Sequence, residues 1–181
     1  MKKALVLLFD KFEEIEAIAP IDIMRRAGVD VLTASLESGL CVVGRSGITV
    51  EADAFFKDVC RRNFDIVVLP GGPGVHNLKG CEPVLEVLKK QAESGGLLAA
   101  ICAAPVVLDT AGVLAGTMCT AHACVAESLG NCDQSKRVVF DKNVITSRGA
   151  GTAVEFALKI VEILSGEKTS KDVAKSIHFI D

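Results

Sequence analysis

One cysteine has a sequence context that suits nucleophilic chemistry. Cys102 follows the apolar run Leu97–Ile101 and precedes two alanines, Pro105 and a short helix expected at Val106–Leu108. A cysteine between a buried strand and a helix is held at a sharp turn with its sulfur exposed, as in a nucleophile elbow. Because the N–H groups at a helix start stabilise a thiolate, we expect the pKa of this thiol to lie below its usual value of about 8.5.

A glycine-rich loop follows another expected strand. Gly71 and Gly72 lie in the run Val67–Gly74, where glycines can turn main-chain N–H groups toward one point. Together with the N–H of Ala103, this loop predicts an oxyanion hole and substrate-binding site. A tight surface turn is the plain alternative. A phosphate-binding loop is another, although the GK[ST] ending that it requires is absent.

An acidic run follows the first expected strand. We expect Glu13 and Glu14 to be surface residues that interact favourably with the start of a helix. Glu16 differs because Ile15 and Ala17 flank it on the more apolar side of that helix. A carboxyl group in such surroundings has a raised pKa and can donate a hydrogen bond to a thiolate. The sequence therefore predicts a Cys102–Glu16 pair.

The histidines give a weaker signal. His76 and His178 are expected on the surface, and His122 follows what we expect to be a short strand. A zinc site built from Cys119, His122 and Cys124 would have irregular spacing. No metal ion is expected.

Five apolar runs without alternation predict strands that are covered on both faces, as in a parallel sheet: Ala4–Phe9, Val29–Ala34, Asp65–Leu69, Leu97–Ile101 and Val144–Thr146. Segments of helical periodicity lie between or after them: Glu13–Ala27, Glu82–Ser94 and Thr152–Leu164. The first helix is expected to have one apolar side, made of Ile15, Ile18, Ala19, Ile23 and Met24. Hairpins are predicted at Cys41–Val50 and Arg137–Thr146. This order predicts an open, mostly parallel α/β sheet with helices on both faces, in one domain spanning residues 1–181.

Composition limits the partners. The chain has 181 residues, 50% of them apolar, and a net charge of −3, so it has neither the basic footprint of a nucleic-acid-binding protein nor a polybasic membrane patch. The start, Met1–Asp10, is expected to be a buried strand because its apolar run is too short for a signal peptide. Seven cysteines without a CxxC pair indicate reduced thiols and a cytoplasmic protein.

Six ordered motifs point to a known family. They are EEIE at Glu13–Glu16, MRRAG at Met24–Gly28, VVLPGG at Val67–Gly72, AAICAAP at Ala99–Pro105, ITSRG at Ile145–Gly149 and EFALKIVE at Glu155–Glu162. Together they resemble the DJ-1/PfpI superfamily, also called ThiJ/PfpI. Within it they resemble the DJ-1 branch, the parkinsonism-associated deglycase family. The resemblance covers nearly the whole chain.

The resemblance implies a flavodoxin-like three-layer sandwich and a homodimer with active sites near the interface. It implies these roles: Cys102 as an oxidation-prone nucleophile, Glu16 as its protonated partner, Gly72 and Ala103 as oxyanion donors, His122 as the histidine near the cysteine, and Arg45 with Arg25 or Arg26 as arginines beside the site. Three residues depart from the pattern, namely Phe12, Ala123 and Ala150. These departures concern the rim of the pocket, so they bear on how a substrate fits more than on the identity of the nucleophile.

The implied activity is a cofactor-free reaction on reactive carbonyls, together with a role in oxidative stress. The protein would be a glutathione-independent glyoxalase acting on methylglyoxal-like compounds, or a deglycase acting on glycated protein. A non-enzymatic redox sensor or chaperone that works through Cys102 oxidation is the main alternative. A PfpI-type peptidase is disfavoured because Ala103 stands where that branch has histidine. A flavin or nucleotide module is disfavoured because Asp10–Phe12 has no phosphate-binding residues.

Overall fold

A seven-stranded sheet forms the centre of the molecule. The computed structural model describes residues 1–179. The strand order is β5 (Ala54–Phe55), β2 (Asp30–Ser35), β1 (Lys3–Leu8), β6 (Ile66–Leu69), β7 (Leu97–Ile101), β9 (Val144–Ser147) and β8 (Val138–Asp141). All neighbouring strands are parallel except β8 and β9. The predicted parallel strands are therefore confirmed.

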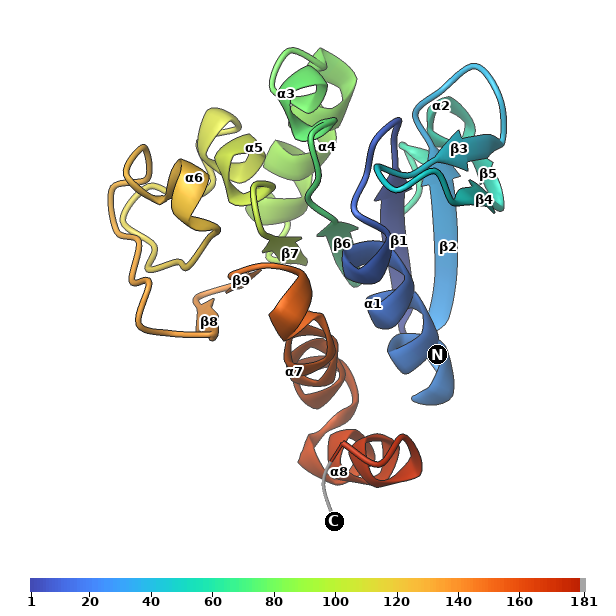
Figure 1. Ribbon diagram of the computed structural model, residues 1–181, viewed down its shortest axis with the longest axis vertical. Helices are drawn as coiled ribbons and strands as arrows, with labels where there is room; N and C mark the ends of the chain where they lie inside the picture. The colour runs from blue at the N-terminus through green and yellow to red at the C-terminus, as the bar shows by residue number, and fades with distance from the viewer. Residues whose placement is uncertain (180–181) are drawn as a thin grey trace.

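Helices cover both faces of the sheet, as Figure 1 shows. One face carries α1 (Glu14–Arg26), α7 (Ala153–Ser165) and α8 (Glu167–Ser176). The other carries α2 (Phe56–Val59), α3 (Val75–Leu78), α4 (Glu82–Glu93) and α5 (Pro105–Thr110), with α6 (Ala123–Ala126) beyond α5. A short 3₁₀ turn, η1 (Ala150–Thr152), precedes α7. This arrangement is the predicted three-layer sandwich of flavodoxin-like type.

Each central strand contributes to two hydrophobic cores. In β1, Ala4 and Val6 pack in the core beneath α1 and α7, whereas Leu5 and Leu7 pack in the core beneath α4 and α5. Successive side chains of a strand point to opposite faces. A strand buried on both faces is therefore apolar at every position, which explains the continuous apolar runs.

Both predicted hairpins are present. The first joins β3 (Cys41–Val43) to β4 (Thr49–Glu51) outside the main sheet. The second joins β8 to β9 through Lys142, whose φ is 54°. No helix within residues 1–179 is long and apolar enough to cross a membrane.

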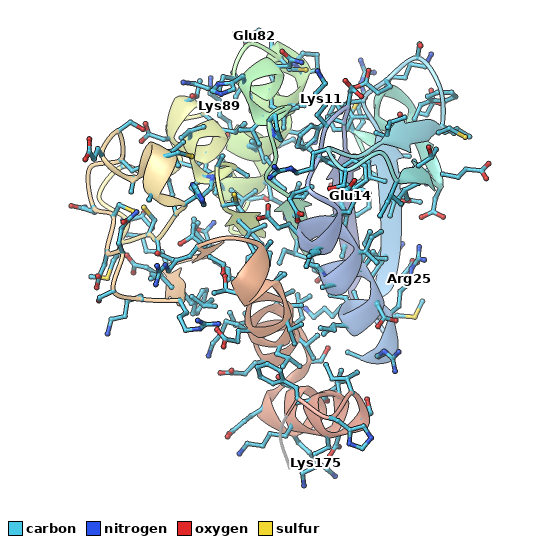
Figure 2. All side chains as sticks on the ribbon, viewed as in Figure 1. Lys11, Glu14, Arg25, Glu82, Lys89 and Lys175 are labelled. Atoms are coloured by element: carbon cyan, nitrogen blue, oxygen red, sulfur yellow. The ribbon has the colours of Figure 1, made fainter. Side chains whose placement is uncertain are left out.

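The prediction for the sides of α1 is wrong in part. Ile15 and Ile18 are 55% and 41% exposed, whereas Glu13 and Glu14 are buried. The reason is the β3–β4 hairpin, which lies against the start of α1, where Ser46 donates its N–H to Glu14 Oε1 at 2.7 Å. Figure 2 shows Glu14 between α1 and this hairpin. A tertiary contact thus buries residues that we expected on the surface.

Candidate active site

Cys102 occupies the elbow that was predicted. It follows β7 directly and has a φ of 65°, in the left-handed region that costs a non-glycine residue about 1–2 kcal/mol. Its N–H donates to the Ser147 carbonyl at 2.9 Å, and its carbonyl accepts the His122 N–H at 2.8 Å. Two neighbouring segments therefore hold a strained backbone in place, which is common at functional sites. The side chain is half-buried at the carboxyl edge of the sheet.

Glu16 projects from the first turn of α1 into the same site. Only 1% of the residue is exposed. The Gly71 N–H donates to its Oε2 at 2.8 Å, and the Ala150 N–H also stabilises the carboxylate. Glu13 caps the helix by accepting the Glu16 N–H at 3.1 Å. Because α1 and two loops fix the carboxyl group, it is held facing the Cys102 thiol.

Burial and mutual repulsion set the ionisation of this pair. Burial, opposed by hydrogen bonds from Cys102 and Gly71, raises the pKa of Glu16 to about 7. Burial and then the Glu16 charge raise the pKa of Cys102 to about 12, although the Ala103 N–H acts in the opposite direction. Since each negative charge disfavours the other, the two groups hold one proton between them once the pH rises above about 7.

The expected low pKa of the thiol is therefore wrong for the resting site. Helix α5 begins only at Pro105, three residues after Cys102, and has six residues. Its N-terminus offsets neither burial nor the nearby carboxylate. The prediction of a raised carboxyl pKa is confirmed in direction.

The two glycines of the Gly71–Gly72 loop have different roles in the site. The Gly71 N–H is used by Glu16, so Gly71 positions the carboxyl group and does not serve as an oxyanion donor. The Gly72 N–H has no acceptor among residues 1–179, and the Ala103 N–H points to the Cys102 sulfur. Gly72 and Ala103 therefore remain the two candidate oxyanion donors.

Replacing Gly71 with alanine should damage the site through a steric clash. A Cβ at this position would lie 2.5 Å from Glu16 Oε2 and 2.7 Å from Cys102 Cβ. We expect Gly71→Ala to slow alkylation of Cys102 by at least about tenfold, since misplacing a catalytic group by about 1 Å can cost about 100-fold. Gly80→Ala is the matched control, because its Cβ would meet nothing within 4 Å. Equal alkylation rates in the two variants would show that the close packing at Gly71 is unimportant.

His122 lies at the rim of the site. Its Nδ1 accepts the Cys124 N–H at 3.2 Å and lies 3.0 Å from the Cys124 sulfur. Because Nδ1 acts as an acceptor, the neutral ring carries its hydrogen on Nε2. The ring lies near Gly149, and a Cβ added at Gly149 would lie 4.0 Å from the Cys102 sulfur. His122 is thus close enough to the nucleophile to serve a bound substrate.

The predicted arginines do not meet Cys102 within this chain. Arg26 lies at the far end of α1 and pairs with Asp22 at 2.8 Å, ten residues or about 15 Å along the helix from Glu16. Arg25 also lies at that end and pairs with Asp53. Arg45 lies exposed in the turn of the β3–β4 hairpin, where its N–H donates to the Phe12 carbonyl.

Two other arginines, which the sequence did not single out, line a pocket beside the site. Arg137 and Arg148 line this pocket of about 420 Å³ together with His122, Gly149 and Ala150. Arg137 is held by Glu155 at 2.6 Å. The motif ITSRG contains Arg148, so its position just after β9, at the carboxyl edge of the sheet, was the available signal.

A metal centre finds no support in the part of the chain that is described. No group of three or more His, Cys, Asp or Glu side chains within residues 1–179 could hold an ion. Cys119 is buried against Cys132, away from the His122–Cys124 contact. The irregular zinc site considered from the sequence is therefore not assembled.

Fold and site together define an α/β sandwich protein with a cysteine at a strand-to-helix elbow, opposite a buried glutamate. The DJ-1/PfpI family profile matches residues 2–163. The chain is 43% identical to the Drosophila melanogaster protein dj-1beta, over 97% of this chain and 96% of that protein. The chain belongs to the DJ-1/PfpI family.

Two further relatives bear on the site. The Caenorhabditis elegans protein named glutathione-independent glyoxalase DJR-1.2 is 42% identical, over 97% of this chain and 96% of that protein. A solved structure described as Toxoplasma gondii DJ-1, oxidized, superposes with a TM-score of 0.94 at 35% identity and covers 98% of each chain. The fold is therefore shared with DJ-1 proteins over its full extent.

Proposed function

We propose that this protein consumes small reactive carbonyl compounds of the methylglyoxal type, as a glutathione-independent glyoxalase or a protein deglycase. The observation that carries the proposal is the Cys102 thiol at a strained elbow, faced by the buried carboxyl group of Glu16. The glyoxalase name of the Caenorhabditis elegans relative supports it. No cofactor is required, because the thiol supplies the nucleophile.

The chemistry follows from the placement of the groups. The Cys102 sulfur attacks the aldehyde carbon while its proton passes to the Glu16 carboxylate, and a hemithioacetal forms. The N–H groups of Gly72 and Ala103 stabilise the developing oxyanion. Glu16 or His122 then moves a proton between the two adjacent carbons, which gives a thioester that water hydrolyses to lactate. A carboxyl pKa of about 7 suits this work, since general acid–base catalysis is most efficient near the operating pH.

The test is to incubate the purified protein with methylglyoxal in the absence of glutathione and to follow both substrate and lactate. We expect stoichiometric conversion to lactate. A glycated peptide as substrate separates deglycase from glyoxalase activity, because it releases free amine. If neither lactate nor free amine forms, the carbonyl function is wrong.

A redox-sensing role through the same thiol is the second candidate. The solved relative described as oxidized favours it, and the Ala103 N–H beside the sulfur could donate to a sulfinate oxygen. After mild peroxide treatment, mass spectrometry should detect sulfinate on Cys102 before it detects sulfinate on any other cysteine. An even distribution over all seven cysteines would exclude a special site. We also propose a cytoplasmic location, because the seven cysteines include no CxxC pair and lack the spacing of a secreted disulfide scaffold.

We infer that two chains pair through the start of α1 and the β3–β4 hairpin. Ile15, Ile18, Val43 and Ile48 are all more than 40% exposed there, and the buried Glu14 Oε2 has no partner among residues 1–179. Such a patch is typical of an interface. In such a symmetric dimer, Arg45 in the β3–β4 hairpin of one chain would lie near the surface of the partner chain.

Placing a charge in this patch should separate the chains. Ile18→Glu is expected to change the species seen by sedimentation velocity from dimer to monomer. Lys89→Glu, at an exposed position of α4, should leave the dimer intact. A dimer that persists in Ile18→Glu would place the interface elsewhere.

A further inference from the structure

Two cysteines outside the active site lie side by side on neighbouring extended segments. Cys119 and Cys132 form a parallel β-bridge. The Cys119 N–H donates to the Asn131 carbonyl at 2.9 Å, and the Asp133 N–H donates to the Cys119 carbonyl at 2.8 Å. These two hydrogen bonds set the register, so the two cysteines are directly opposite each other with side chains on the same side.

We propose that Cys119 and Cys132 are a reversible redox site, in which a hydroperoxide converts the two thiols into a disulfide. Neither residue belongs to the carbonyl mechanism, so this inference is independent of the proposed function. The pair is distinct from Cys102, and its oxidation does not consume the nucleophile.

The geometry suits a disulfide. Neighbouring β-segments lie about 4.7–4.9 Å apart, and disulfides join Cα atoms about 4.4–6.8 Å apart. The two side chains lie on the same side of the bridge, and burial, followed by interaction with Cys132, raises the pKa of Cys119 to about 12. The usual spacing across a β-bridge thus falls within the range that a disulfide spans.

Exposure assigns the order of the two steps. Cys132 is half-buried, whereas Cys119 is 1% exposed. The Cys132 sulfur attacks the peroxide O–O bond, which gives a sulfenic acid and releases an alcohol, or water when hydrogen peroxide is used. The Cys119 sulfur then displaces water from that sulfenic acid and forms the S–S bond. Two electrons pass from the two sulfurs to the peroxide, and both thiol protons leave in the products.

The disulfide would close the segment that forms one wall of the active-site pocket. Residues 119–132 include Ala121, His122 and Ala123, all of which line the pocket. The His122 N–H holds the Cys102 carbonyl. Oxidation would therefore tie together both ends of the loop that supports the nucleophile, and a reductant would release them.

The chain allows the bond to be mapped by digestion. Trypsin combined with a protease that cleaves after glutamate releases Ser128–Lys136, whose only cysteine is Cys132. It also releases Ser94–Glu127, which contains Cys102, Cys119 and Cys124. After treatment with about stoichiometric hydrogen peroxide and alkylation of remaining thiols, we expect these peptides to be joined, two hydrogens lighter than their sum, and dithiothreitol to separate them.

Single substitutions identify the partner. The cross-link should persist in Cys102→Ser and Cys124→Ser and disappear in Cys119→Ser and Cys132→Ser. Because Cys119 is buried and its variant could be unstable, half-buried Cys132 provides the second test, with folding of each variant checked by circular dichroism. A cross-link that survives in Cys119→Ser, or recovery of wild-type Cys132 only as free thiol or sulfinate, would overturn the proposal.

Discussion

Replacing Cys102 with serine is expected to abolish methylglyoxal consumption, with a loss of at least about 10³-fold in kcat/KM. A serine hydroxyl is far less acidic than a thiol, so Glu16 cannot take its proton as the oxygen attacks. The strained φ of 65° at this position is retained in the variant, because serine has the same backbone requirements. The loss would therefore report on the sulfur and not on the turn.

The matched control is Cys81→Ser, which changes a half-buried thiol at the start of α4. It should keep wild-type kcat/KM and the wild-type melting temperature. Substantial lactate formation by Cys102→Ser would mean that another group is the nucleophile. The assay should follow lactate directly, since any exposed thiol removes some aldehyde without turning it over.

Replacing Glu16 with glutamine should reduce activity and stabilise the fold at the same time. Glutamine keeps the shape but cannot accept the thiol proton, so we expect a loss of about 10²–10⁴ in kcat/KM, the usual contribution of general acid–base catalysis. The pKa of Glu16 is raised from 4.5 to about 7 in the folded protein. The folded state therefore binds more protons than the unfolded state between these values, and its stability falls as pH rises through them.

The Glu16→Gln variant has no carboxyl group to ionise at this position, so it should not lose this stability as the pH rises. At pH 8 Glu16→Gln should unfold with a free energy up to about 3 kcal/mol higher than wild type, which is the pKa difference converted at about 1.4 kcal/mol per pH unit. At pH 4.5 the two proteins should be nearly equal, because the wild-type carboxyl group is then neutral in the folded state. Urea unfolding at both pH values measures the difference. A variant less stable than wild type at pH 8 would mean that the ionised carboxylate is well satisfied.

Most of the fold could be predicted because its signals are local. Strands buried on both faces must be apolar at every position, so β1, β2, β6 and β7 were visible as continuous runs. The elbow was visible because Cys102 lies between such a strand and a helix start. The carboxyl edges of parallel strands then bring Gly71 and Cys102 together.

The remaining features depend on contacts between distant segments. The burial of Glu14 requires Ser46 of the β3–β4 hairpin, 32 residues further along the chain. Helical periodicity alone assigned Ile15 and Ile18 to the core, whereas they face outward. The Cys119–Cys132 contact also depends on a loop whose path has no periodic pattern.

The thiol pKa was mispredicted for a related reason. The N–H groups at a helix start favour a thiolate, but burial and the charge of Glu16 outweigh that effect at Cys102. Glu16 lies on α1, far from Cys102 in the sequence, and only the fold brings the two side chains together. A local sequence pattern cannot state how two buried acids divide one proton.

The central claim is that the Glu16 carboxylate takes the proton of the Cys102 thiol when the sulfur reacts. The most direct measurement is the rate of Cys102 alkylation by iodoacetamide from pH 5 to pH 9, in wild type and in Glu16→Gln. We predict that the wild-type rate rises through a midpoint near pH 7, the pKa of Glu16, and that this step is absent in the variant. A wild-type rate already at its plateau at pH 5, or the same midpoint in both proteins, would contradict the claim.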